Sequence, residues 1–156
     1  MASNFSPAMK ALELVFEELS GHQVVLSFGS TGKHYAQIKN GAPFDVFMAA
    51  DIERPRLLET QGLAQTDSRM TYARGKLILW TSKSGIDDIK NTLLIGKDFR
   101  HLAVANPKLS PYGLAAQQVM IKLDVWPRLQ PKLVRGENIA QTFQFVHSGN
   151  AGLGFV

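Results

Sequence analysis

The sequence predicts an α/β protein with a mostly parallel sheet. Short apolar runs alternate with amphipathic stretches of about ten residues, which is the pattern of βαβ units. The chain has 156 residues, of which 45% are hydrophobic and 19% are charged. This balance suits one globular domain or two small lobes. No internal repeat or low-complexity segment interrupts the alternation.

The first predicted element is a helix. Ser6 and Pro7 form a favourable helix start, and Gly21 is a typical helix end. Apolar residues recur at helical spacing between them and predict one apolar face, formed by Ala8, Ala11, Leu12, Val15, Phe16 and Leu19. A short buried strand is predicted over 23–28, and a second helix follows that ends at 40–41.

The middle of the chain continues the alternation. A second strand is predicted over 44–50, and Asp51 is placed to cap the helix that follows and that runs to Gly62. The next predicted strand covers 76–81.

The last third of the chain predicts two further units of strand and helix. A short helix is predicted over 87–94, a strand over 101–106 and a helix over 110–123. A helix over 137–150 and a last strand from residue 152 complete the pattern.

Composition excludes several classes of protein. The net charge is +4, but the basic residues are dispersed and do not interleave with aromatic residues, so nucleic acid is not the expected partner. The chain has no cysteine, which excludes disulfide frameworks and thiolate zinc sites. The four histidines lie far apart, so no metal site is predicted. We find no apolar run long enough for a membrane span and no signal-peptide pattern at the N-terminus.

The stretch "SFGSTGKHYAQI" (27–38) has the residues of an anion-binding turn. A nucleotide-binding P-loop needs G-x-x-x-x-G-K-[ST], whereas Gly29, Gly32 and Lys33 give only G-x-x-G-K, so we reject the P-loop. A small tetrahedral oxyanion needs only a few N–H groups and hydroxyls at a helix N-terminus, which Ser30 and Thr31 would supply. Taken alone, this turn is better explained by simple capping of the helix, which accounts for most turns of this kind.

Three further helix starts carry the same kind of chemistry: Ser3-Asn4 before Ser6-Pro7, Ser110-Pro111-Tyr112-Gly113, and Gly136-Glu137-Asn138-Ile139. In open α/β sheets such turns lie beyond the carboxyl ends of the strands, where ligands bind. Together they predict an uncharged cage for an anion. Lys33 is interpreted as a solvated side chain, and Asp45 and Asp51 as loop or cap residues, because a carboxylate would repel the anion.

Four stretches taken together resemble one family. They are "SNFSPAMK", "SFGSTGKHYAQIKNGAPFDVFMAAD", "NPKLSPYGLAAQ" and "GENIAQTFQFVHSGNAGLGFV", and "NGAPFDVFMAAD" is the most specific piece. In this order and spacing the chain resembles the periplasmic molybdate-binding receptors of bacterial ABC transporters, which are type II periplasmic binding proteins. The resemblance implies two α/β lobes with the ligand cleft between them, over 1–78 and 79–156. Both lobes would be incomplete, because the first strand and the C-terminal segment of the family are missing.

The resemblance also implies the function. The chain would bind molybdate or tungstate as the substrate-binding component of a transporter in the periplasm, with a membrane permease as its partner. It would carry out no catalysis and hold no cofactor and no metal other than the molybdate ion. The implied ligand residues are Ser3, Asn4, Ser30, Thr31, the backbone N–H of Tyr112 and the backbone of Ile139. Asn4 and Tyr112 stand where some members carry Ser and Ala.

Two alternatives stay open. The first is an orphan or regulatory oxyanion-sensing domain derived from this family, with or without retained ligand binding. The second is a phosphate-handling enzyme, which would need a general acid or base beside the site; the sequence offers none at a matched position. The missing first strand also suggests a homo-oligomer formed by strand exchange.

Overall fold

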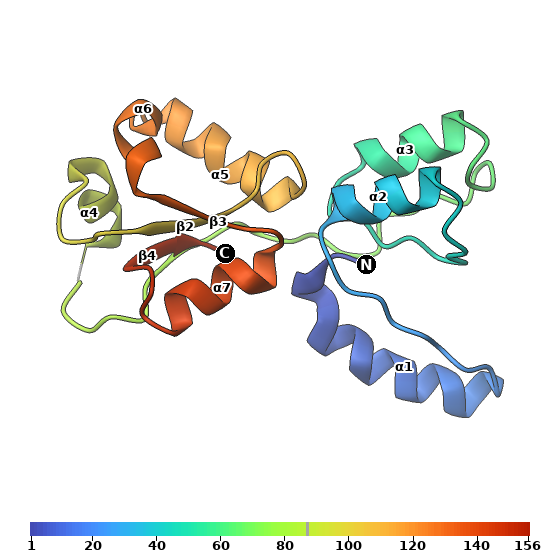
Figure 1. Ribbon diagram of the computed structural model, residues 1–156. Helices are drawn as coiled ribbons and strands as arrows, with labels where there is room; N and C mark the ends of the chain where they lie inside the picture. The colour runs from blue at the N-terminus through green and yellow to red at the C-terminus, as the bar shows by residue number, and fades with distance from the viewer. Residues whose placement is uncertain (87) are drawn as a thin grey trace.

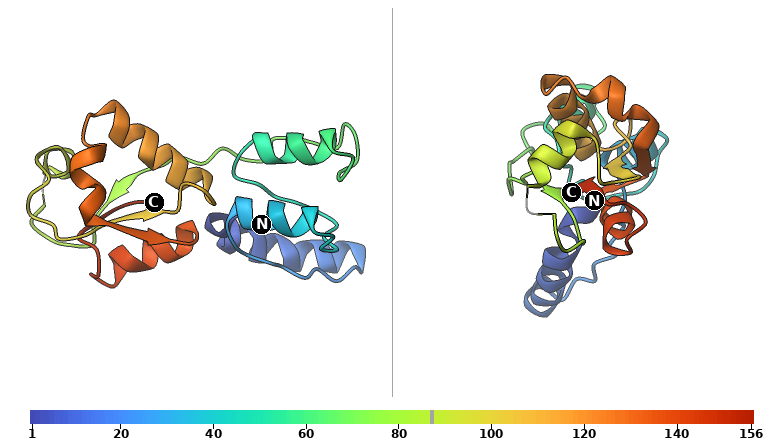
Figure 2. Two further views of the ribbon diagram at one scale, coloured as in Figure 1. Left: turned by 45° about the horizontal axis from the view of Figure 1, so that its top comes forward. Right: turned by 90° about the vertical axis from the view of Figure 1, so that its left-hand side faces the viewer.

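The computed structural model describes residues 1–86 and 88–156, and its elements form two groups (Figure 1). A short 3₁₀ turn, η1 (Ser3–Phe5), leads into α1 (Ser6–Ser20). Helices α2 (Thr31–Lys39) and α3 (Glu53–Thr60) lie in the same group. The sheet and the remaining helices form the second group, which lies beside the first in Figure 1 and in the left view of Figure 2. The predicted lobe division at residue 78 stays a prediction.

Within the described residues, four strands form one sheet in the order β1-β4-β2-β3. They are β1 (Leu79–Trp80), β2 (Leu102–Ala105), β3 (Leu133–Gly136) and β4 (Leu153–Phe155). Strand β2 pairs in parallel with both β3 and β4, while β1 runs antiparallel to β4. The mostly parallel sheet that the sequence predicts is therefore confirmed.

Helices cover both faces of this sheet. On one face, α4 (Ile89–Ile95), α5 (Pro111–Lys122) and α6 (Trp126–Leu129) pack in a single apolar cluster with the strands. On the other face, α7 (Ile139–His147) packs through Val146 against Ala103 of β2. Figure 1 shows α5 and α6 above the sheet and α7 below it. A 3₁₀ turn, η2 (Gln130–Lys132), joins α6 to β3.

Most predicted helices are present. Gly21 ends α1 in the left-handed conformation, with φ of 71°, as the sequence predicts. Asp51 accepts a hydrogen bond from the backbone N–H of Arg54 at 2.9 Å, which is the predicted capping role. The predicted start of the fourth helix at Asp87 lies outside the described residues; α4 itself begins at Ile89. Helix α6, turn η2 and strand β3 are not predicted by the sequence patterns.

The two strands predicted over 23–28 and 44–50 are wrong. Neither segment forms a ladder within the described residues, and the one bridge here joins Ala2 to Gly29. Backbone hydrogen bonds reach the bridge from both sides, because Gly29 N–H donates to Met1 O and Ala2 N–H donates to Met48 O. A strand is defined by its hydrogen bonds to a neighbouring strand. Between the segments 23–28 and 44–50 lies only the short stretch at Ala2, which forms a single bridge and no ladder. The strand predicted over 76–81 shortens to β1.

The predicted apolar face of α1 is not buried. The structure contains no buried residue in this helix, and the exposed side chains include Leu12, Val15, Phe16 and Leu19. Helix α1 extends away from the rest of its group in Figure 1, so the face has no packing partner there. The helical periodicity was a correct guide to the helix and not to its burial.

Over the two described stretches, we find no helix that has both the length and the apolarity needed to cross a membrane.

Candidate functional site

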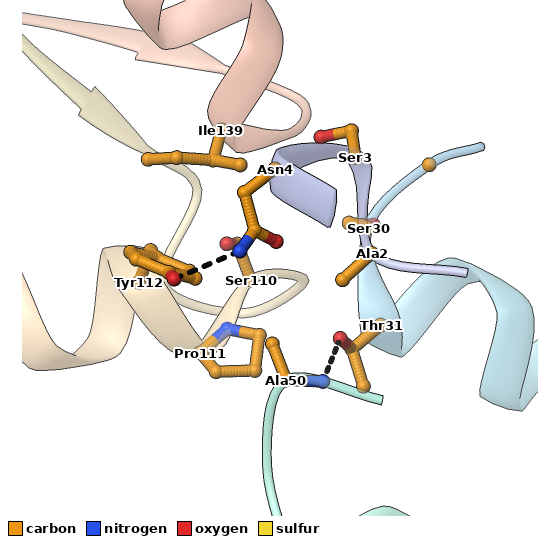
Figure 3. A pocket seen from close by; sticks show the side chains of 11 residues that line it. Ala2, Ser3, Asn4, Ser30, Thr31, Ala50, Ser110, Pro111, Tyr112 and Ile139 are labelled. Atoms are coloured by element: carbon orange, nitrogen blue, oxygen red, sulfur yellow. Dashed lines mark hydrogen bonds between the residues drawn. The ribbon is translucent and has the colours of Figure 1, made fainter. Parts of the chain in front are cut away.

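A small pocket lies where the two groups of elements meet (Figure 3). It has a volume of about 10 Å³, which corresponds to about one water molecule. All the ligand residues implied by the sequence resemblance line it. The complete lining is Ala2, Ser3, Asn4, Gly29, Ser30, Thr31, Ala50, Ser110, Pro111, Tyr112 and Ile139.

The pocket wall is built from the starts of helices. The 3₁₀ turn η1 begins at Ser3, α2 at Thr31, α5 at Pro111 and α7 at Ile139. The first N–H groups of a helix have no partner inside the helix and carry its positive partial charge. Among the hydrogen bonds of the described residues, none uses the backbone N–H of Thr31, Tyr112 or Ile139 as a donor. These groups are therefore available to an anion.

Ser30 provides the clearest sign of a ligand. It is the N-cap of α2, yet its side chain makes no capping hydrogen bond, so simple capping does not explain it. The residue is 4% exposed, and its Oγ is buried without a hydrogen-bond partner among the described residues. A buried hydroxyl normally has a partner, because an unsatisfied one costs about 1–3 kcal/mol.

Thr31 has one hydrogen bond and one remaining donor. Its Oγ1 accepts from the backbone N–H of Ala50 at 3.1 Å, and the residue is 1% exposed. A hydroxyl both donates and accepts. Because the acceptor side is used by Ala50, the hydroxyl proton is left to donate into the pocket.

Ser3 differs from the expectation in detail. Its hydroxyl donates to Asn138 Oδ1 at 3.3 Å and accepts from Ala140 N–H at 3.2 Å. Its backbone N–H donates to Gly29 O at 3.0 Å. Both donors of Ser3 are thus used inside the protein, and the residue joins η1 to α7. A direct bond to a ligand would require its hydroxyl to turn away from Asn138.

Close backbone contact at Gly32 joins α2 to the loop before α5. Gly32 N–H donates to Leu109 O at 2.8 Å, and a Cβ at Gly32 would lie 2.8 Å from that oxygen. Only glycine fits this approach without displacing backbone. Gly32, the second glycine of GSTGK, therefore allows close packing against Leu109, and its role is not to bind phosphate groups.

The pocket lining contains no charged side chain. Its one ionisable group is the Tyr112 phenol, and burial raises the pKa of this phenol, so it is neutral at physiological pH. Lys33 is outside the lining and forms an exposed ion pair with Glu137 at 3.1 Å, which agrees with its interpretation as a solvated residue. Across the described residues, no group of three or more metal-ligating side chains is present.

The site contains residues that were not predicted to bind the ligand, although one of them, Ser110, belongs to a predicted helix start of the anion cage. Ser110 is 3% exposed, lines the pocket and makes no capping hydrogen bond although it is the N-cap of α5. It shares these properties with Ser30, and its place in a Ser-Pro helix start was a usable signal. Ala2, Gly29 and Ala50 also line the pocket, and residues without a polar side chain give no signal of a site in the sequence.

A second, larger cavity adjoins the same loop. It has a volume of about 300 Å³ and shares Gly29 and Ser30 with the pocket. His34 lines it and is 4% exposed, with Nε2 3.2 Å from Met1 O and Nδ1 3.0 Å from Gln37 Oε1. Desolvation by burial lowers the pKa of His34, and the positive N-terminus lowers it further.

Comparison with known proteins finds solute-binding proteins both by family and by individual relative. The family model for bacterial extracellular solute-binding proteins matches residues 1–156. The molybdate-binding protein ModA of Azotobacter vinelandii is 51% identical over the whole chain, and that of Rhodobacter capsulatus is 45% identical. The chain spans 62% of the length of each of these curated relatives.

A solved structure shows the same fold. The periplasmic molybdate-binding protein of Azotobacter vinelandii superposes with a TM-score of 0.93 and 44% sequence identity, over 99% of this chain and 68% of that one. The periplasmic-binding-protein-like α/β fold is therefore confirmed. Because the family model covers the full sequence, the chain belongs to the bacterial extracellular solute-binding proteins, a family of binding proteins and not of enzymes.

Proposed function

We propose that the chain binds molybdate as the substrate-binding component of an ABC transporter. The observation that carries this proposal is the convergence of Asn4, Ser30, Thr31, Tyr112 and Ile139 on one pocket without charged side chains. The names of the relatives support the choice of anion, since two of them are molybdate-binding proteins at 51% and 45% identity.

Neutral donors suit a protein that must both hold and release its ligand. Each hydrogen bond to a charged oxygen contributes about 1.5–3 kcal/mol, so several of them give firm binding. Helix N-termini and hydroxyl groups supply these bonds without a full countercharge that would have to be separated again at release.

Tungstate is part of the proposal, and sulfate is excluded from it. Molybdate and tungstate are nearly equal in size, whereas sulfate is smaller. A smaller ion cannot reach donors on all walls at once, and each buried donor left unsatisfied costs about 1–3 kcal/mol. We therefore expect tungstate to bind about as tightly as molybdate and sulfate to bind much more weakly.

Calorimetric titration tests the proposal. The 156-residue chain is titrated with sodium molybdate, then with tungstate, and with sulfate as the control. Saturable binding near one molybdate per chain, unaffected by an equal concentration of sulfate, is the expected result. A sample that is folded by circular dichroism but gives no molybdate heat would favour the orphan or regulatory alternative.

The same resemblance supports three further proposals. The protein acts in the periplasm, delivers its anion to a membrane permease, and is organised as two lobes over 1–78 and 79–156. Self-association through unpaired strand segments is a fourth, supported by the exposure of Val25 (95%) and Val46 (76%) in the segments that lack ladders.

A further inference from the structure

A hydrogen bond between two side chains crosses the mouth of the pocket. Asn4 Nδ2 donates to Tyr112 Oη at 2.9 Å, although the residues are 108 positions apart in the sequence. Figure 3 shows the Asn4 side chain extending from η1 toward the start of α5, where the phenol of Tyr112 meets it. Asn4 is exposed while Ser30 and Thr31 behind it are buried, so this bridge lies on the solvent side of the pocket.

The phenol reaches this position only because residue 75 is glycine. A Cβ built on Gly75 would overlap Tyr112 Oη and would lie 3.3 Å from its Cζ. Gly75 is not among the glycines with positive φ, so its backbone conformation is open to other residues. The absence of a side chain therefore creates space for the phenol.

We propose that the Tyr112 phenol is a positioning group that holds Asn4 across the mouth of the pocket and slows release of the bound anion. This inference rests on the proposed function and adds a role to the Tyr112 side chain, where only the backbone N–H was assigned before. The bridge ties η1 to α5, so the two walls cannot separate while it is intact. Because both groups are neutral, the bridge closes the pocket without attracting or repelling the anion.

Tyr112→Phe is the first test. It removes the hydroxyl, keeps the ring and leaves the backbone N–H in place. Protein loaded with radiolabelled molybdate is mixed with excess unlabelled molybdate, and the release rate is measured. One ordinary hydrogen bond corresponds to a release about 3- to 10-fold faster. Because the anion passes the same bridge on entry, association should be as fast as in the wild type or faster.

Gly75→Ala disrupts the same hydrogen bond from another segment of the chain, because the added Cβ would overlap the Tyr112 hydroxyl. The overlapping atom is the far end of a side chain, so the phenol moves aside and the fold is retained. We expect release to accelerate as much as in Tyr112→Phe. In the double variant the hydroxyl is already absent, so Gly75→Ala should add no further acceleration.

Tyr35→Phe is the matched control. The Tyr35 hydroxyl accepts from Gln61 Nε2 at 3.3 Å, away from the pocket, and its loss should leave both rates unchanged. The unfolding midpoint of Tyr112→Phe without ligand should be only slightly lower than that of the wild type, because a single exposed hydrogen bond is lost.

The outcomes separate the two proposals. If the wild type fails to bind molybdate, the proposed function is wrong. If the wild type binds but Tyr112→Phe releases at the wild-type rate, the positioning role is wrong. Slower association in Tyr112→Phe together with a large fall in its unfolding midpoint would also overturn it, since that is the result of a structural role alone.

Discussion

Ser30 and Thr31 are neighbours in one loop, but their hydroxyl groups have different surroundings. The Ser30 Oγ is buried without a partner, whereas the Thr31 Oγ1 holds the backbone N–H of Ala50. Removing one hydroxyl should therefore affect ligand affinity alone, and removing the other should also affect folding.

Ser30→Ala should weaken molybdate binding and leave the free protein as stable as before. A hydrogen bond to a charged oxygen of about 1.5–3 kcal/mol corresponds to roughly a 10- to 100-fold rise in Kd. Calorimetry measures the Kd and thermal unfolding measures the stability. Ser148→Ala is the control, because its hydroxyl donates to Gln144 O at 2.7 Å at the end of α7. An unchanged Kd in Ser30→Ala would contradict the assignment.

Thr31→Val should destabilise the free protein by about 1–3 kcal/mol, because the partly buried N–H of Ala50 loses its acceptor. Urea unfolding without ligand measures this change. Thr31→Ser keeps the hydroxyl and should recover most of the stability. Equal stabilities for the Val and Ser variants would show that the hydrogen bond is unimportant.

His34 should make stability depend on pH. Burial lowers its pKa from the ordinary value of 6.5, so near and below that pH the unfolded chain binds more protons than the folded one. The contribution of His34 to the free energy of unfolding is therefore fully present above pH 6.5, and it is lost as the pH drops toward the lowered pKa. Urea unfolding from about pH 7.5 to about pH 5 tests this, and His34→Gln should reduce the slope. An equal slope in both proteins would exclude His34 as the cause.

At the scale of elements, the contact between α5 and β2 fixes one wall of the pocket. Gly113, in the first turn of α5, lies so close to the end of β2 that an added Cβ would overlap the backbone oxygen of Ala105. The backbone N–H of Tyr112 is the neighbouring group. Its position therefore depends on the absence of a side chain at residue 113.

Gly113→Ala should destabilise the protein by about 1–3 kcal/mol and weaken molybdate binding, because the helix start must move away from the strand. Urea unfolding and calorimetry give the two quantities. Leu114→Ala is the control on the same helix; its side chain is 47% exposed, so a change below about 1 kcal/mol is expected. Full stability in Gly113→Ala would contradict the close contact.

The sequence was a good guide to helices and a weaker one to strands. Helix starts are local signals, so α1, α2, α5 and α7 were predicted within a few residues of their observed bounds. Strands depend on partners distant in the sequence. The segments 23–28 and 44–50 have the composition of buried strands but no ladder, while β3, in "PKLVRG", is too short and too charged to be recognised.

At the scale of the whole molecule, the candidate site depends on contacts between residues distant in sequence. The helix starts were recognised by their residue types, and the resemblance assigned them to a common ligand. It was not predictable that the Ser3 hydroxyl would be occupied by Asn138, because that depends on how η1 meets α7. The hydrogen bond from Asn4 to Tyr112 was not predictable either, because it joins two elements that lie 108 positions apart in the sequence.

Exposed apolar side chains should make the chain associate with itself as its concentration rises. Leu19 of α1 is 83% exposed and Val25 is 95% exposed. Leu19→Lys combined with Val25→Lys should shift the population toward monomer in sedimentation velocity, because charged residues oppose apolar contact. Met70→Lys, at a position 76% exposed, is the control and should have a smaller effect. A wild-type chain that stays monomeric at all concentrations would contradict this expectation.

The order of strands in the sheet has a consequence for synthesis of the protein on the ribosome. Strand β4, which follows the other three strands in the sequence, lies between β1 and β2. Until Leu153–Phe155 have left the ribosome, β1 has no neighbour, and the edge of β2 that will receive β4 stays open. Domains tend to fold as units during translation, and unpaired strand edges are prone to aggregation. This sheet is therefore completed only after β4, the fourth of its strands in the sequence, has been translated.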